Sequence, residues 1–478
     1  MFLAAFGLND YLLRVFSQWG HFENLLTMIE RLLLASNFSQ HSTFLMDTTL
    51  YTNYPFKVSE TLMFAILFTN VNIFMLMQTM HSRGQYLVSD FKPAERLKRI
   101  KVSGIRRFFG LAQETPDIIN LSVGEPDFTP PRYALEAGCQ AAKEGKTHYA
   151  PTNGIPELRE ALAQKAYNEY GLSYDPKSEI LVTVGGAEAI FSALTALINP
   201  GDEVLIPNPG FVCYEPCVLL AGGVPVSVPL LEKNGFKPSA DDVMSLITEK
   251  SRVIILNYPN NPTGAVLSRN EVAALAKIAV ERDMLVISDE VYEKIIYDNA
   301  NHHSAATFPE MRERTLVVNS FSKTYAMTGL RVGFVYGPRE LISPIWLTHQ
   351  YIVTCVDNLA QYIALAALKG PQDFVKEMVQ EFDRRRCLVY KRLNEIEGFN
   401  CTLPKGAFYV FPKIKDFGVS SEAFAEFLVK NARVAAVHGS AFGSYGEGYM
   451  RISYSAAYEQ LEEALDRIEN AVKAFKKT

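Results

Sequence analysis

The stretch 319–334, NSFSKTYAMTGLRVGF, places one lysine beside hydroxyl groups and near an arginine, with no Asp or Glu in the run. Lys323 follows Ser320 and Ser322, and Arg331 lies eight residues further on. A lysine without a carboxylate partner and close to a second cation loses its proton more easily, and the neutral amine is a nucleophile toward carbonyl groups. The alternative interpretation of Lys323 is a surface lysine in a polar loop.

The same stretch also suits a phosphate group. Serine hydroxyls and an arginine fork bind a phosphate monoester well, and so do the bare N–H groups of a glycine turn that opens a helix. Such a turn occurs at GGAEAIF, which includes Gly186 and Ala187. A carbonyl cofactor that carries a phosphate would therefore satisfy both Lys323 and its neighbours.

Asp289 is the next candidate, because it follows the apolar run MLVIS and should lie at the edge of a buried sheet. A carboxylate there needs a cation or several donors to offset its desolvation. The protonated ring nitrogen of pyridoxal phosphate is such a cation, and the pairing makes the ring an electron sink. Tyr292 and Asn261 are candidate donors to the ring's phenolic oxygen. The alternatives are a helix N-cap for Asp289 and an ordinary turn residue for Asn261.

The elements that must position these residues alternate short β-branched runs with stretches of helical length. The runs are EILVTV, EVLIP, RVIILN, MLVIS and TLVVN, and each leads directly into polar or glycine-rich residues. This alternation predicts an α/β fold with a mostly parallel sheet covered by helices. Ligands of such sheets bind beyond the carboxyl ends of the strands, so the turns should converge on one pocket.

The length of 478 residues predicts at least two domains. After about residue 370 the pattern changes to charged amphipathic helices with few strands, which indicates a smaller α+β domain. We predict a large cofactor-binding domain at 131–370 and a small domain at 371–478, with 85–130 as an N-terminal arm and part of the small domain.

Residues 1–84 form an apolar extension of a different character. The segment 61–82 contains no Asp, Glu, Lys or Arg, but Thr69, Asn70 and Asn72 interrupt its centre, so it is a marginal membrane span. Three interpretations stay open: a start codon set too early, a membrane or interfacial anchor, and a helical appendage. Contact with a membrane is expected only if this extension is native.

Charge and cysteine content exclude several classes of function. A net charge of -5 and a pI near 6.0 supply no basic surface for nucleic acid. The six cysteines lack the paired spacing of metal ligands, so we predict no metal site and reduced thiols in the cytoplasm.

The motifs GEPDF, YAPTNGIPELREAL, NYPNNPTG, SDEVY and SFSKTYAMTGLRVGF resemble those of the class I pyridoxal-phosphate-dependent aminotransferases of fold type I. They occur in the family's order and cover the chain from about residue 90 to the C-terminus. The resemblance is greatest to archaeal aromatic and aspartate aminotransferases. It implies a mostly parallel seven-stranded sheet with helices on both faces and a smaller α+β domain.

The resemblance also implies roles for individual residues. Lys323 would hold the cofactor covalently and then move the proton between the substrate's Cα and the cofactor, while Asp289 would pair with the ring nitrogen. Arg451 would bind the substrate's α-carboxylate, and the backbone of Gly124 would close over it. The remaining cofactor contacts would be Tyr292 and Asn261 to the phenolic oxygen, Phe211 to the ring face, and Gly186, Ala187, Ser320, Ser322 and Arg331 to the phosphate.

Tyr149 matches a tyrosine that reaches the phosphate of the neighbouring subunit, so the resemblance implies a homodimer with shared active sites. Ala187 stands where some members that prefer acidic substrates have a lysine. We therefore expect a ping-pong aminotransferase that moves the amino group of aromatic or large apolar L-amino acids to 2-oxoglutarate. The alternatives are an aspartate aminotransferase and a C–S lyase of the same fold.

Overall fold

The computed structural model describes residues 92–100, 102, 104, 105, 107, 108, 110 and 115–475. The extension 1–84, with its three open interpretations, lies outside the described residues. No helix within the described residues is long and apolar enough to cross a membrane.

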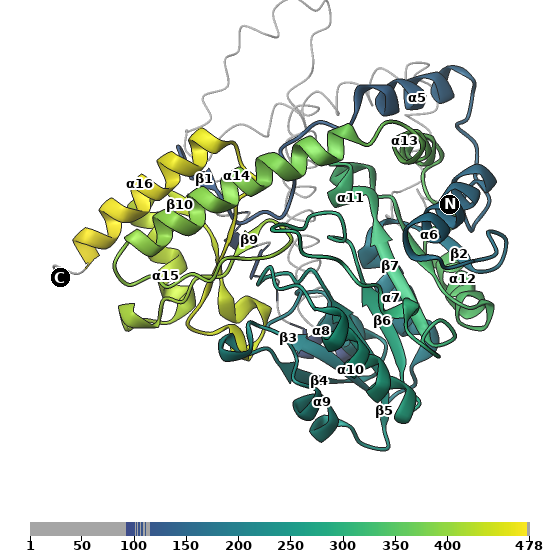
Figure 1. Cartoon of the computed structure of the whole chain (residues 1–478), viewed down its shortest axis with the longest axis horizontal. Coiled ribbons are helices and arrows are strands. Elements are labelled where there is room, and N and C mark those ends of the chain that lie inside the picture. Colours follow the sequence, from purple (N-terminus) through teal and green to yellow (C-terminus); the bar gives the residue numbers. More distant parts are fainter. Residues whose placement is uncertain are drawn as a thin grey trace, which may run out of the picture. The chain divides into compact units, whose positions relative to one another are not determined.

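A seven-stranded sheet lies at the centre of the larger part of the described chain (Figure 1). Its order is β2-β8-β7-β6-β5-β3-β4. Strand β8 runs in the opposite direction to the other six strands, which all run parallel to one another. The predicted seven-stranded, mostly parallel sheet is therefore confirmed. The strands are β2 (Ile180–Thr183), β3 (Glu203–Asn208), β4 (Val224–Pro229), β5 (Ser251–Asn257), β6 (Leu285–Asp289), β7 (Thr315–Ser320) and β8 (Gly333–Tyr336).

Helices cover both faces of this sheet, because successive side chains of each strand point to opposite faces. In β5, Val253 and Ile255 pack on one face, while Ile254 and Leu256 pack on the other. The first face is covered by α7 (Gly185–Leu197), α8 (Tyr214–Leu220) and α12 (Arg339–Val353). The second is covered by α5 (Arg132–Lys143), α6 (Pro156–Tyr170), α9 (Ala240–Leu246), α10 (Arg269–Glu281) and α13 (Asn358–Lys369).

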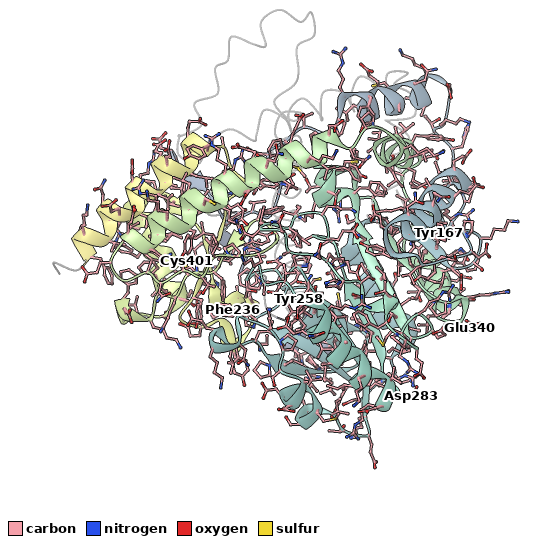
Figure 2. All side chains as sticks on the ribbon, viewed as in Figure 1. Tyr167, Phe236, Tyr258, Asp283, Glu340 and Cys401 are labelled. Atoms are coloured by element: carbon pink, nitrogen blue, oxygen red, sulfur yellow. The ribbon has the colours of Figure 1, made fainter. Side chains whose placement is uncertain are left out.

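Local sequence signals begin and end several of these helices. A capping box opens α10, in which Ser268 Oγ accepts from the Glu271 N–H and the Glu271 carboxylate accepts from the Ser268 N–H. Helix α6 has Pro156 in its first turn and ends at Gly171, whose φ of 69° suits glycine. Phe236 and Tyr258, both labelled in Figure 2, belong to the apolar cluster that also contains residues of α10 and β5.

The smaller α+β part is built mainly from the C-terminal residues. A three-stranded antiparallel sheet, β11-β12-β9, packs with long helices around a separate apolar core that includes Cys401 (Figure 2). The arm before residue 130 joins it, since β1 (Ile119–Asn120) pairs with β10 (Val434–Ala435). The other elements are α14 (Asp373–Glu395), β9 (Tyr409–Val410), α15 (Ser421–Phe427), β11 (Val437–His438), β12 (Met450–Ser453) and α16 (Tyr458–Phe475), with short helices between them.

Most of the candidate site residues lie at one edge of the large sheet. The strands β2, β3, β5, β6 and β7 all end at this edge, and β8 begins there because it runs the other way. The turns that follow these ends carry the motifs singled out in the sequence.

Candidate active site

A cavity of about 550 Å³ lies at this edge of the sheet. It is lined by residues from five strand ends, from the arm and from the small α+β part, as the strand-end rule predicts. Every predicted site residue except Tyr149 contributes to the lining. These residues are Gly124, Gly186, Ala187, Phe211, Asn261, Asp289, Tyr292, Ser320, Ser322, Lys323, Arg331 and Arg451.

Lys323 lies on the short helix α11 (Phe321–Thr324), directly after β7. Its Nζ donates a hydrogen bond of 2.5 Å to the Gly124 carbonyl. Burial lowers the pKa of Lys323 to about 8, and the charge of Arg451 acts in the same direction. A substantial fraction of this amine is therefore neutral near pH 8, as a nucleophile requires.

Asp289 is the last residue of β6 and is 3% exposed. Burial raises its pKa to about 6, against a hydrogen bond of 2.6 Å that Tyr214 Oη donates to Oδ2. The N-cap alternative is wrong, because a turn rather than a helix follows Asp289. Tyr214 was not among the predicted site residues, although its hydroxyl, three residues after Phe211 and at the start of α8, was an available signal.

The end of the cavity suited to an anion is built from α7 and from the residues around Lys323. Helix α7 begins at Gly185, whose φ of 72° favours glycine, and a Cβ atom there would lie 2.5 Å from Arg331 Nη2. Ser320 Oγ donates to Ser322 Oγ at 2.8 Å. Backbone N–H groups of α7, two hydroxyls and a guanidinium thus meet at one end of the cavity.

Arg451 on β12, in the smaller α+β part, also lines the cavity and is 1% exposed. Its Nη1 donates to Asn261 Oδ1 at 3.1 Å, and its Nη2 donates to the Ser122 carbonyl. Its buried Nε has no hydrogen-bond partner among the described residues. A buried guanidinium with an unused donor is suited to a carboxylate ligand.

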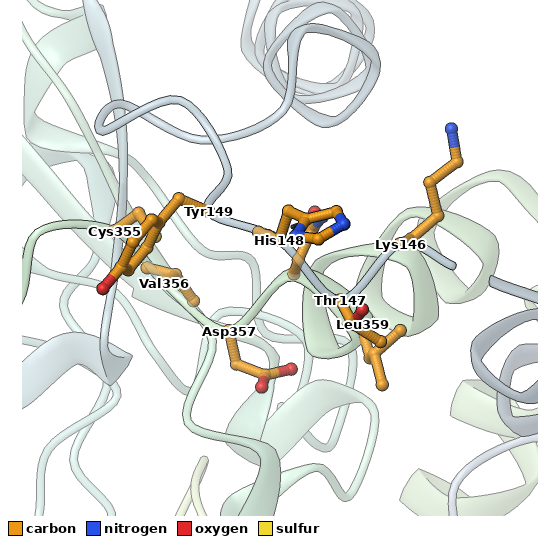
Figure 3. A pocket seen from close by; sticks show the side chains of 9 residues that line it. Lys146, Thr147, His148, Tyr149, Cys355, Val356, Asp357 and Leu359 are labelled. Atoms are coloured by element: carbon orange, nitrogen blue, oxygen red, sulfur yellow. Dashed lines mark hydrogen bonds between the residues drawn. The ribbon is translucent and has the colours of Figure 1, made fainter. Parts of the chain in front are cut away.

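Tyr149 is the predicted site residue that this chain does not bring into the cavity. It is 87% exposed and lines a separate hollow of about 570 Å³ with His148, Cys355 and Asp357 (Figure 3). Its hydroxyl is therefore free to contact another molecule.

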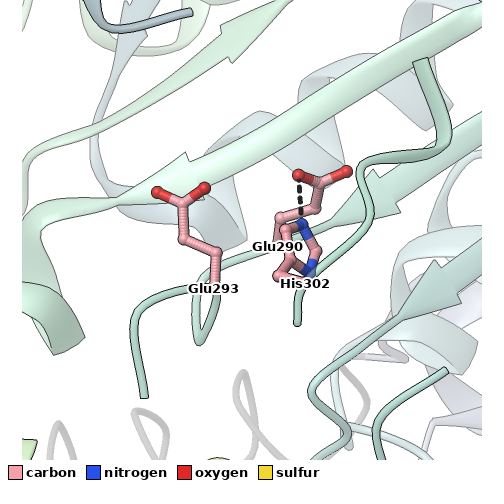
Figure 4. A group of neighbouring side chains, drawn as sticks. All are labelled: Glu290, Glu293 and His302. Carbon is pink, nitrogen blue, oxygen red and sulfur yellow. Dashed lines mark hydrogen bonds and ion pairs between the residues drawn. The ribbon is translucent and has the colours of Figure 1, made fainter. Parts of the chain in front are cut away.

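Glu290 and Glu293, which directly follow Asp289 and Tyr292 in the sequence, are buried, and Glu290 pairs with His302 (Figure 4). Glu290 accepts hydrogen bonds from two serines and contacts His302 Nε2 at 2.8 Å. Glu293 contacts Lys165 Nζ at 2.7 Å. Although burial opposes it, Lys165 lowers the pKa of Glu293 to about 2. A lysine thus supplies the charge that balances Glu293.

Comparison with known proteins identifies the family. The family model described as "Aminotransferase class I and II" matches residues 116–468 of this chain. An aspartate aminotransferase of Pyrococcus abyssi is 48% identical over 387 residues, which cover 80% of this chain and 99% of that protein. Aromatic-amino-acid aminotransferase 2 of Thermococcus litoralis is 47% identical over 385 residues, which cover 80% of this chain and 99% of that protein.

Solved structures agree with this result. The aromatic aminotransferase from Pyrococcus horikoshii OT3 is 48% identical, with a TM-score of 0.74, over 78% of this chain and all of that chain. This chain belongs to the aminotransferase class I and II family, whose members are pyridoxal-phosphate-dependent transaminases with the fold type I architecture. The family resemblance inferred from the motifs is confirmed, and so is the expectation of an enzyme that transfers amino groups.

Proposed function

We propose that this aminotransferase binds pyridoxal phosphate in the cavity at the sheet edge and acts by a ping-pong mechanism on aromatic or other large apolar L-amino acids, with 2-oxoglutarate as acceptor. The observation that carries the proposal is the presence in one cavity of a lysine whose pKa is lowered and an aspartate whose pKa is raised. Such opposed shifts are typical of catalytic groups.

The donor set of the cavity fits this cofactor. Asp289 is a buried carboxylate that a protonated pyridine nitrogen would stabilise. Tyr292 and Asn261 are available to the phenolic oxygen and Phe211 to the ring face, while Gly186, Ala187, Ser320, Ser322 and Arg331 are suited to the phosphate. When bound, the cofactor's ring accepts the electron pair of the broken Cα–H bond.

The chain's own residues then have distinct tasks. Lys323 Nζ would hold the cofactor, be displaced by the substrate's amine, and then take the Cα proton and deliver it to the cofactor. Asp289 would keep the ring nitrogen protonated. Arg451 binds the α-carboxylate, and its hydrogen bond to Asn261 orients the guanidinium.

Apolar side chains favour a large apolar substrate. Ile105, Val123, Ile190, Phe211 and Val212 line the cavity, and Ala187 contributes no cation near the anion end. One relative is named for aspartate and another for aromatic amino acids, so aspartate remains the alternative substrate.

A half-reaction screen tests this proposal. Each amino acid is added to enzyme loaded with pyridoxal phosphate, the loss of visible absorbance is followed, and the products are identified. We expect phenylalanine, tyrosine and tryptophan to react at least about tenfold faster than aspartate, with one oxo acid formed per cofactor converted. Failure of every aromatic amino acid would contradict the substrate proposal, and release of ammonia with a cleaved C–S bond would identify a lyase.

Replacing Arg451 with lysine should raise KM for the amino acid by about 10- to 100-fold, because a lysine keeps the charge but cannot bind a carboxylate with two parallel hydrogen bonds. Steady-state kinetics with an aromatic substrate measure this effect. Arg467→Lys, on the surface of α16, serves as the matched control. An unchanged KM in Arg451→Lys would remove Arg451 from the carboxylate site.

Replacing Tyr214 with phenylalanine should raise the pKa of Asp289 above about 6, because the ionised carboxylate loses its 2.6 Å donor. Pairing with the cofactor's protonated ring nitrogen requires ionised Asp289, so the acid limb of the apoenzyme's affinity for pyridoxal phosphate should move upward by about one pH unit. Tyr258→Phe is the control, because Tyr258 does not line the cavity and its hydroxyl donates to the Phe236 carbonyl. The same acid limb in both variants would contradict the assigned role of Asp289.

The homodimer is also part of the proposal. Tyr149 is exposed outside its own chain's cavity, and α12 exposes Trp346, Leu347, Tyr351 and Ile352. Exposed apolar groups on one helix are typical of a protein interface. A second copy that covers them would receive Tyr149 near its phosphate site. The domain boundaries and the cytoplasmic location remain predictions, the latter supported by six free cysteines.

A further inference from the structure

Tyr409 on β9 is a buried residue of the cavity to which the sequence analysis gave no role. It is 1% exposed and lies between two predicted site residues. Its Oη lies 2.7 Å from Tyr292 Oη, and the Arg451 guanidinium lies 4.4 Å from its ring centroid. One side chain therefore contacts both the proposed cofactor donor and the proposed carboxylate site.

The fit of Tyr409 against the arm is also close. A Cβ atom at Gly124 would collide with Tyr409 Oη, so the hydroxyl has glycine backbone on one side and Tyr292 on the other. Gly124 in turn supplies the carbonyl that accepts from Lys323 Nζ. The position of the Tyr409 hydroxyl is thus determined by the same backbone that contacts the catalytic lysine.

The chemistry of the two hydroxyls indicates which one donates. Burial raises the pKa of both tyrosines, and that of Tyr292 is raised well above the ordinary value. The Arg451 charge opposes this effect at both tyrosines, and at Tyr409 it is the largest cause after burial. Among the described residues, Tyr292 Oη is the hydrogen-bond partner of the buried Tyr409 Oη, and a buried hydroxyl donates to the acceptor within its reach, so Tyr409 donates and Tyr292 accepts. The proton of Tyr292 then remains available to a ligand oxygen in the cavity.

We propose that Tyr409 is a positioning residue: its hydroxyl donates to Tyr292 so that the Tyr292 proton points to the ligand's phenolic oxygen, and its ring face supports the Arg451 guanidinium. The inference rests on the proposed binding of pyridoxal phosphate. Among the described residues, the titratable and charged side chains that contact Tyr409 are Tyr292 and Arg451.

The test compares Tyr409→Phe with the wild-type holoenzyme. The substitution keeps the ring beneath Arg451 and removes the one hydroxyl. We expect the pH midpoint of the visible absorbance of bound pyridoxal phosphate to shift by about one unit, because Tyr292 no longer orients its proton. KM for the amino acid should stay within about twofold, since the support for Arg451 remains. Tyr454→Phe is the matched control: Tyr454 is buried in the same core and donates to the Ala407 carbonyl instead.

Each outcome decides the matter. A shift in Tyr409→Phe without a shift in Tyr454→Phe supports the positioning role. No shift in Tyr409→Phe, or an equal shift in both variants, overturns it. Wild-type enzyme that neither binds pyridoxal phosphate nor turns over would overturn the proposed function itself, whereas a normal wild type with an unshifted Tyr409→Phe overturns this inference alone.

Discussion

Lys323→Ala is expected to lower kcat by at least about 10⁴-fold and to remove the visible absorbance that the wild type shows with pyridoxal phosphate. In the proposed mechanism the amine is both the nucleophile that holds the cofactor and the base that moves the substrate's proton, so one substitution would remove both tasks. Absorbance spectra and steady-state rates with an aromatic amino acid measure the two effects. Lys277→Ala, a surface change on α10, is the matched control.

The apoprotein offers a second measurement on the same residue. The pKa of Lys323 in the folded chain is about 8, below its value of about 10.4 in an unfolded chain. The unfolded state therefore binds more protons between these values, and stability falls as the pH drops from about 10 to 8. Lys323→Met should consequently raise the melting temperature of the apoprotein at pH 7. Normal absorbance or turnover in Lys323→Ala would end the assignment.

Asp289→Asn is expected to lower kcat by roughly 10³-fold, because a neutral amide cannot keep the ring nitrogen protonated. The asparagine has nearly the same volume, and its carbonyl oxygen can still accept from Tyr214, so the loss concerns charge rather than packing. The affinity for pyridoxal phosphate should fall as well, which a titration of apoenzyme measures.

The pH profile provides a check on this prediction that does not depend on absolute rates. The affinity of the wild-type apoenzyme for pyridoxal phosphate should fall as the pH drops through about 6, since Asp289 becomes protonated there. Asp289→Asn should lack this limb and stay flat across the same range. A variant that retains the acid limb would show that another group controls it, and full activity would exclude Asp289 from the ring site.

The sequence by itself determined the fold class and most of the cavity. Strand runs such as MLVIS and TLVVN are local patterns, and the rule that strand ends share one edge brings Asp289 and Lys323 together without any knowledge of contacts. The motif resemblance added Arg451 and Gly124, which come from the small α+β part and the arm. All of these residues line the same cavity at the edge of the large sheet.

Only the tertiary structure decided the contacts that join distant segments. Tyr214 to Asp289, Tyr409 to Tyr292 and Lys165 to Glu293 each join residues 75 or more positions apart, and no local periodicity specifies such pairs. The helix N-cap considered as an alternative at Asp289 is wrong for the same reason: a turn follows Asp289, and within it Glu293 pairs with Lys165, which is distant in the sequence. Local patterns determine which residues form strands and turns, whereas protonation depends on which distant charges burial brings within a few ångströms.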